Sequence, residues 1–368
     1  MVLLILCVFL YHCARFFDQY PWHVKDTVVS PVVVTITGFM IMWMLPAIFV
    51  ISGAGIWYSL GYQRPLKFIR GKILRLFIPL VFGIFVLSPH QVYLERLTTG
   101  QFSGSFFAFI PHYFDGLYGL GGNFAWIGMH LWYLLPLFLF LRSGTGGTVI
   151  RALGSFFRIP GTIYLLGLPL AVPMAYISEE SFFGMRVWAG WNIVFYLILL
   201  ICGFLIFADE RIQKAIVMQR FASLLLGIVL LATFRLGLTF APSPLRLGWH
   251  QYVLSAWCFI TAILGFGMKH LTDSNRFLEI GSEAVLPFYI LHQPVILLIG
   301  FWIVQLSIPV FVKYLVIMIL SFSVLVNNKF IVTGGLTWQL KRKNTNWQRR
   351  LLRQRWDFSG ISLFTFVP

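Results

Sequence analysis

Three histidines lie in or beside long apolar segments, where an ionisable side chain is costly and is therefore a candidate for function. They are His12 in FLYHCARFF, His130 in MHLWYLLPL and His292 in LPFYILHQPVI. An imidazole, with an unperturbed pKa of about 6.5, can take a proton from a substrate hydroxyl near neutral pH. Because no two histidines have the HxxxH spacing of a zinc site, the sequence predicts general acid–base chemistry and no metal.

A second group of candidates is the cationic run RPLKFIRGKILR, which leads directly into the apolar segment LFIPLVFG. Lys72 and Arg75 are three residues apart and would share one face of a helix. Arg75 already lies in the apolar stretch, which costs energy unless the guanidinium has a partner. The run is explained either as an anchor on the cytoplasmic face or as a site for a phosphorylated ligand, in which Arg70, Lys72 and Arg75 would contact phosphate.

The composition indicates which elements must position these groups. Hydrophobic residues make up 59% of the 368-residue chain and charged residues only 11%, whereas soluble domains are about 25% charged. A soluble chain cannot bury so much apolar surface, but a bilayer can accommodate it. We therefore predict an all-α polytopic membrane protein, a single bundle of about ten transmembrane helices in the lipid bilayer.

The candidate spans are ten apolar runs, at residues 2–14, 32–60, 73–88, 124–141, 160–177, 190–207, 221–240, 250–268, 284–306 and 308–327. When the connections are taken alternately, one set holds 21 of the 28 Lys and Arg residues and the other holds 7. Cytoplasmic connections collect Lys and Arg. The sequence thus predicts a multi-pass protein of the inner (plasma) membrane, with both termini cytoplasmic and residues 89–123 outside. The same bias explains the net charge of +16 without a nucleic-acid partner.

The chain divides into a predicted transmembrane domain, residues 1–327, and a basic cytoplasmic tail, residues 328–368. The sequence contains no Walker motif, no GxGxxG or GxSxG motif and no pair of catalytic carboxylates. Its four cysteines form no CxxC pair and are predicted to be small buried hydrophobic residues. None of the common nucleotide-binding or hydrolase motifs therefore accounts for the histidines.

Several longer segments resemble the integral-membrane acyltransferase type 3 family, which includes sugar O-acetylases and periplasmic-glucan succinyltransferases. The resemblance extends over about residues 1–326 and is carried by FLYHCARFF (9–17), PAIFVISGAGIWYSL (46–60), FIRGKILRLFIPLVFG (68–83), PHQVYLERL (89–97), GSFFAFIPHYFDGLYG (104–119), NFAWIGMHLWYL (123–134) and EAVLPFYILHQPVI (283–296). It implies an O-acyltransferase that moves an acetyl, succinyl or similar group from cytoplasmic acyl-CoA to a hydroxyl of an envelope carbohydrate or related acceptor. Acyl-CoA would be a donor substrate, with no bound cofactor.

The resemblance also implies roles for individual residues. His12 matches the histidine of the family's Arg-x10-His motif and would be the general base, while His130 and His292 match positions at which relatives commonly carry histidine. Lys72 and Arg75 match the Arg-x-x-Arg motif, with lysine in place of the first arginine. Lysine keeps the charge but cannot form the two-pronged contact of arginine. Lys72 and Arg75 would lie on the inner face of the membrane, and His12 and His130 on its outer side, as acyl transfer across the bilayer requires.

The arginine of the Arg-x10-His motif falls on Met1, and the first apolar run is short. Residues eleven apart lie within about 20° of the same helix face and ~16 Å apart. This arginine and His12 would therefore line the same wall of a channel. We expect the first helix to be truncated and the chain as given to be weakly active or inactive in transfer. Met1→Arg, behind a short basic and apolar leader, should raise ester formation from labelled acyl-CoA in proteoliposomes. Strong turnover by the unaltered chain would contradict this expectation.

Two other interpretations stay open on the sequence alone. One is a transporter or flippase of a lipid-linked or acyl intermediate, and the other is an inactive relative of the enzymes. Inverted halves with interrupted helices at matched positions are typical of transporters, and the sequence shows no such symmetry.

Overall fold

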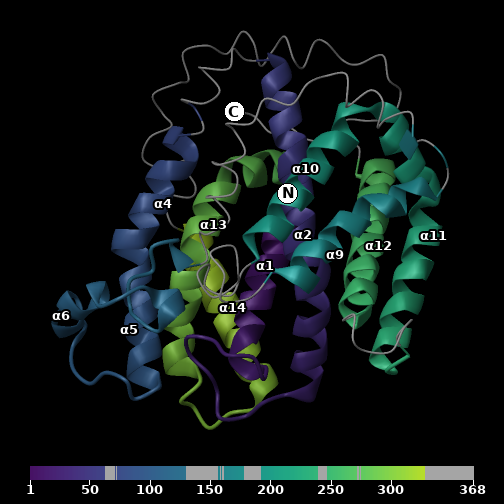
Figure 1. Ribbon diagram of the computed structural model, residues 1–368. Coiled ribbons are helices and arrows are strands. Elements are labelled where there is room, and N and C mark those ends of the chain that lie inside the picture. Colours follow the sequence, from purple (N-terminus) through teal and green to yellow (C-terminus); the bar gives the residue numbers. More distant parts are fainter. Residues whose placement is uncertain are drawn as a thin grey trace.

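The computed structural model is a bundle of helices, and the residues that it describes contain no β-strand (Figure 1). Those residues are 1–62, 71, 73–129, 156–157, 159, 161–177, 192–238, 247–271, 273 and 275–327. Most of the predicted fourth span and the basic tail 328–368 lie outside them.

The long helices are α2 (Pro31–Tyr62), α11 (Glu210–Arg235), α12 (Leu247–His270), α13 (Arg276–Ile303) and α14 (Val310–Asn327). Shorter helices are α1 (Val2–Ala14), which runs into the 3-10 turn η1 (Arg15–Phe17), then η7 (Thr162–Gly167) with α9 (Leu168–Tyr176), and α10 (Ile193–Ala208). One helical run joins the π-helix η2 (Ile73–Phe77), α4 (Ile78–Phe82), the π-helix η3 (Gly83–Leu87) and α5 (Ser88–Thr98). The loop after α5 contains α6 (Phe106–Phe109), η4 (Pro111–Phe114) and η5 (Tyr118–Leu120).

Helices α10, α11 and α13 each begin at a polar side chain that accepts a hydrogen bond from the first turn. Asn192 caps α10, Asp209 caps α11 and Asn275 caps α13. Each side chain satisfies one of the amide groups that a helix leaves without an internal partner at its start. These caps fix where the apolar segments that follow become helical.

Within the residues that the structure describes, six helices are long and apolar enough to cross a membrane: Pro31–Ser59, Ile78–Thr98, Glu210–Arg235, His250–His270, Ala284–Ile303 and Val310–Asn327. Shorter apolar helices occupy Val2–Phe17, Thr162–Tyr176 and Ile193–Ala208. Each of these helices coincides with a predicted apolar run, and the all-helical fold is confirmed for the described residues. The predicted count of about ten is not confirmed, because residues 130–141 of the remaining run lie outside the described ranges.

Two predicted boundaries were wrong by ten residues or more. The third span was expected to end at residue 88, but the helix continues as α5 to Thr98. Residues 210–220 were expected in a connection, yet they form the first turns of α11. In both cases polar residues such as Gln91 and Gln213 lowered the hydropathy, although both side chains are buried by packing against neighbouring helices.

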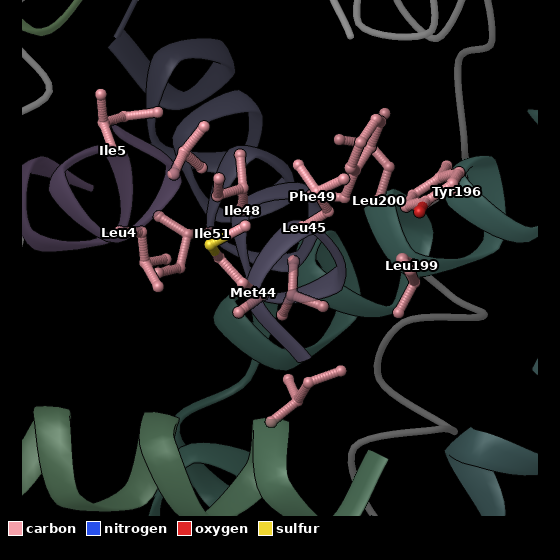
Figure 2. Packing of buried hydrophobic residues seen from close by; sticks show 14 of the residues in the cluster. Leu4, Ile5, Met44, Leu45, Ile48, Phe49, Ile51, Tyr196, Leu199 and Leu200 are labelled. Atoms are coloured by element: carbon pink, nitrogen blue, oxygen red, sulfur yellow. The ribbon is translucent and has the colours of Figure 1, made fainter. Parts of the chain in front are cut away.

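Helices α1, α2 and α10 meet in the main apolar core, where Leu4, Ile48, Phe49 and Leu199 are buried (Figure 2). The crossing of α2 and α10 is close because small residues of one helix face the backbone of the other. A Cβ atom added at Gly203 would overlap the carbonyl of Val50. Small residues permit this kind of close helix approach in membranes.

Gly203→Ala should therefore destabilise the bundle. Alanine favours a helix by about 1 kcal/mol over glycine, but overpacking a tight contact typically costs about 1–3 kcal/mol. The overlap is with backbone, which cannot turn aside, so we expect a net loss, measured as a lower midpoint of thermal unfolding in detergent. Gly71→Ala is the matched control, since an added Cβ there meets nothing within 4 Å. Equal stability of the two variants would contradict the expected crossing.

Candidate active site

His12 and His292 meet although 280 residues separate them in the chain. His12 lies in the last turn of α1 and His292 lies within α13. Nδ1 of His12 is 2.8 Å from Nε2 of His292, and the rings are nearly parallel, with centroids 5.0 Å apart. The packing of α1 against α13 (Figure 1) brings the two imidazoles together.

The hydrogen bonds of His292 determine which nitrogen of each ring carries a proton. Nδ1 of His292 is 2.6 Å from the carbonyl oxygen of Tyr289, and since a carbonyl can only accept, Nδ1 is the donor. With both rings neutral, Nε2 of His292 is an acceptor, and Nδ1–H of His12 donates to it. Nε2 of His12 is then the nitrogen that carries the lone pair, as a general base requires.

A backbone contact within α13 orients the second ring of the pair. The His292 side chain donates to the carbonyl of Tyr289, three residues earlier in the same helix, at 2.6 Å. The ring of His292 is thus held by its own helix as well as by His12.

Aromatic rings surround the pair. Trp22, from the loop after α1, stacks against His12 with centroids 5.8 Å apart and an interplanar angle of 16°. The ring of Phe288 lies almost parallel to that of His292, at 6.4 Å. His292 is fully buried and His12 is half-buried. His12 is therefore the ring of the pair that a substrate could reach more readily.

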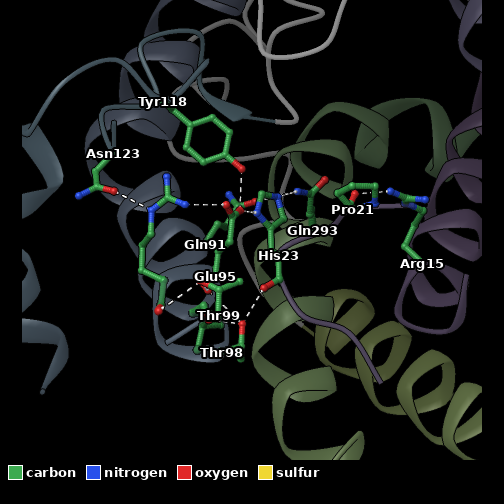
Figure 3. Close-up of polar contacts among 12 residues, drawn as sticks. Arg15, Pro21, His23, Gln91, Glu95, Thr98, Thr99, Tyr118, Asn123 and Gln293 are labelled. Carbon is green, nitrogen blue, oxygen red and sulfur yellow. Dashed lines mark hydrogen bonds and ion pairs between the residues drawn. The ribbon is translucent and has the colours of Figure 1, made fainter. Parts of the chain in front are cut away.

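A second polar row lies beside this pair and begins at Glu95 of α5 (Figure 3). Oε2 of Glu95 is 2.5 Å from Nδ1 of His23, and Nε2 of His23 is 3.1 Å from Nε2 of Gln293. The Gln293 amide also donates to Oε1 of Gln91 at 2.9 Å. Because an amide NH2 group only donates, Nε2 of His23 accepts and its Nδ1–H donates to the carboxylate. The four side chains thus hold one another in one orientation.

Glu95 is also where the outer loop is attached to α5. Tyr118 donates its hydroxyl to Oε2 of Glu95 at 2.6 Å. Burial, together with the neighbouring carboxylate, raises the pKa of Tyr118, so its hydroxyl stays a donor. Arg96 donates to Oδ1 of Asn123 at 2.8 Å and to the carbonyl of Gly122 at 2.7 Å. These bonds fix the end of the loop against the second row (Figure 3).

Buried ion pairs fix the loop between α1 and α2, which carries the imidazole of the second row. Asp18 accepts from Arg15 at 2.5 Å and from Lys25 at 2.8 Å. Burial lowers the pKa of Lys25, an effect that the hydrogen bond to Asp18 opposes. Farther along, Asp26 pairs with Lys313 of α14 at 2.5 Å, and both side chains are buried. The loop is therefore held at two points, on η1 and on α14.

The other predicted site residues lie where the structure describes little. His130, Arg70 and Lys72 are outside the described residues. Arg75 belongs to the π-helix η2, of which only the backbone is described at this position, and π-helical turns are frequent at functional sites. Met129, directly before His130, has a φ of 52°, which residues other than glycine rarely adopt. The roles of these four candidates stay predictions.

Sequence analysis missed the second row. His23 and Glu95 were assigned to outer connections, so neither was considered as part of the site. One signal was present, since Gln293 follows His292 in an apolar run and a polar side chain at that depth needs a partner. Nothing in the sequence indicates that Glu95 meets His23, 72 residues away. Within the described ranges, no three His, Cys, Asp or Glu side chains are grouped as metal ligands would be.

Comparison with known proteins gives this arrangement its context. A family model described as an acyltransferase domain matches residues 2–326, which include both histidines of the contacting pair and the whole second row. No curated protein and no solved structure matches the chain. Since the family model covers most of the sequence, the chain belongs to the acyltransferase type 3 family.

Proposed function

We propose that this protein is an O-acyltransferase of the inner (plasma) membrane, with both termini cytoplasmic. The acyl group, acetyl, succinyl or similar, would pass from cytoplasmic acyl-CoA to a hydroxyl of an envelope carbohydrate or related acceptor. Membership of the acyltransferase family and the apolar helices support the general class. The excess of Lys and Arg in alternate connections supports the orientation.

The observation that carries the proposal is the contact of His12 with His292. Nε2 of His12 takes the proton of the acceptor hydroxyl as the oxygen attacks the thioester carbonyl. A new C–O bond forms, the C–S bond of the thioester breaks, and the proton on His12 passes to the departing CoA thiolate. No other reactant is needed, because the ester and the CoA thiol together contain every atom of the two substrates.

His292 acts in this scheme by positioning His12. Its Nε2 accepts from Nδ1 of His12 at 2.8 Å, so the imidazolium that forms during transfer keeps a hydrogen-bond acceptor. The carbonyl of Tyr289 holds His292 from the other side at 2.6 Å. The arrangement resembles that of a catalytic triad in logic, with an imidazole where a carboxylate orients the base.

The reaction is tested with purified protein in proteoliposomes of known orientation. Labelled acetyl-CoA or succinyl-CoA is supplied on the side of residues 63–72, and envelope glycans are supplied on the other side. We expect release of CoA and ester label on the glycan, both dependent on the protein. Label only when donor and acceptor share one side would contradict transfer across the bilayer, and no ester with any donor and acceptor would contradict the proposal.

The inner cations are proposed to bind the phosphates of CoA. Arg75→Ala should weaken CoA binding by about 1–3 kcal/mol, the worth of a charge-assisted hydrogen bond, and should raise the KM for acyl-CoA. Lys72→Arg should be tolerated, since it restores the arginine of the family motif. Lys214→Ala is the control. The Lys214 side chain is exposed and forms only a loose ion pair, at 4.0 Å, with Glu210 at the start of α11. Unchanged CoA affinity in folded Arg75→Ala would leave the cations as a membrane anchor.

The alternative is a transporter or flippase of a lipid-linked or acyl intermediate. The family match lends it no support. It would be favoured over transfer if labelled intermediate crossed the proteoliposome membrane intact and no ester formed.

A further inference from the structure

The loop that follows α5 folds back along the third span. Phe106 stacks on His90 with centroids 4.1 Å apart. The hydroxyl of Tyr113 donates to the carbonyl of Ile84 at 2.7 Å. Ile84 precedes Thr98, the end of α5, by fourteen residues, which corresponds to roughly 20 Å of helix. Ile84 and His90 lie on either side of residue 88, where the apolar run 73–88 ends. The loop therefore returns to the level at which this helix passes from apolar to more polar residues.

We call residues 102–120 the aromatic arm. Its inner face is a small core of its own, in which Phe109 and Tyr113 pack against Val92 of α5 and all three are buried. With the hydrogen bonds of Arg96 to Asn123, this core fixes the arm against the helix. Figure 1 shows α6, which belongs to the arm, beside α5 at the edge of the bundle.

The outer face of the arm is apolar as well. Phe107 is 80% exposed, Phe114 56% and Leu120 58%. The arm contains no Lys, Arg or Glu, and its only two ionisable groups of opposite sign, His112 and Asp115, are 3.0 Å apart and bond to each other. A surface loop in water would not be expected to expose three large apolar side chains with so little charge.

The exposed face continues the apolar surface of a candidate membrane span, Ile78–Thr98. On the third span itself Phe82 and Phe85 are exposed. Phe85 contacts Phe124, with ring centroids 6.2 Å apart, and Phe124 in turn contacts Phe114 at 5.7 Å. The exposed apolar side of the span is thus joined to the arm through these ring contacts. Aromatic side chains are also the residues that favour the membrane–water interface.

From this continuity we infer that the aromatic arm binds the lipid surface, with Phe107, Phe114 and Leu120 seated in the interfacial layer of the leaflet at the His12 end of the bundle. The occupant is phospholipid, since the face has no charge pattern that a protein partner would need to match and since it lies level with the bilayer. The inference is independent of the transfer reaction.

The test places a fluorophore on the arm. Cys13, Cys202 and Cys258 are buried, so only Cys7 need be replaced, by alanine, before Phe107→Cys is labelled with an environment-sensitive nitrobenzoxadiazole dye. In phosphatidylcholine proteoliposomes we expect blue-shifted emission, quenching by shallow doxyl-labelled lipid and protection from aqueous iodide. Thr99→Cys, at the exposed end of α5, is the control and should show the reverse.

Strong iodide quenching at both positions, without quenching by doxyl lipid, would overturn the inference. Protection from both quenchers would also overturn it, because a protein surface would then cover the arm. A second measurement needs no substitution: a photoactivatable phosphatidylcholine in the same vesicles should attach to peptides from residues 102–120, as found by mass spectrometry. Absence of such adducts, with adducts present on α14, would count against the inference even if the labelled variant failed to fold.

Discussion

Replacement of His12 by alanine should lower acyl transfer by about 10²–10⁴-fold, the usual contribution of a positioned general base. The reason is geometric: Nδ1 of His12 is committed to His292 at 2.8 Å, which leaves Nε2 as the proton acceptor. Binding of CoA should hardly change, because the base acts on the acceptor hydroxyl. The measurement is ester formation from labelled acyl-CoA in proteoliposomes, in the chain and in its Met1→Arg form, alongside CoA binding.

Variants of His292 test whether it works through His12. His292→Leu removes the acceptor for Nδ1–H of His12 at similar volume, whereas His292→Gln can supply an amide oxygen in its place. We expect transfer to fall strongly in the leucine variant and to recover in part in the glutamine variant. A merely structural role would give no such recovery. His270→Ala is the control, because His270 is an exposed histidine at the end of α12. Full activity of the His12→Ala protein would remove His12 from the mechanism.

A second large effect is expected on stability, from the buried pair of Asp26 and Lys313. Nζ of Lys313 is 2.5 Å from Oδ2 of Asp26 and 2.9 Å from the carbonyl of Val304. Lys313→Met would leave the carboxylate buried without its counter-charge, which typically costs about 3–5 kcal/mol. The variant should unfold at a lower temperature or denaturant concentration in detergent.

The double variant Asp26→Leu/Lys313→Met separates the loss of the ion pair from the cost of leaving a buried carboxylate unpaired. Replacing both members of a buried pair by apolar residues is often neutral, so much of the lost stability should return. Lys214→Met is the matched control, since an exposed pair contributes at most about 1 kcal/mol. If Lys313→Met were as stable as Lys214→Met, the pair would not hold the loop.

The spans could be predicted from the sequence because hydropathy over about 20 residues reports directly on the ability to cross a bilayer. That measure failed at α5, where PHQVYLERL reads as a polar connection. The helix continues there because Gln91 and Glu95 find partners on α13 and in the loop after α1. Hydropathy records the cost of a polar group but not the hydrogen bond that offsets it.

The candidate site was only half accessible from sequence. His12 and His292 stood out as ionisable groups in apolar runs, and the resemblance to a family singled out the same positions. Their contact could not be foreseen, because it depends on how α1 packs against α13, and no local pattern encodes that pairing. His23 escaped notice since it lies in a short loop among Trp, Lys and Asp residues, where a histidine is unremarkable.

The two polar rows end on consecutive residues of α13, His292 and Gln293. Neighbouring residues of an α-helix point about 100° apart, so the two rows leave α13 in different directions. Mechanically, the rows are not independent: a rotation of α13 about its axis would turn both side chains together. A displacement of Glu95 that moved His23 and Gln293 would therefore rotate α13, and with it His292 and its contact with His12.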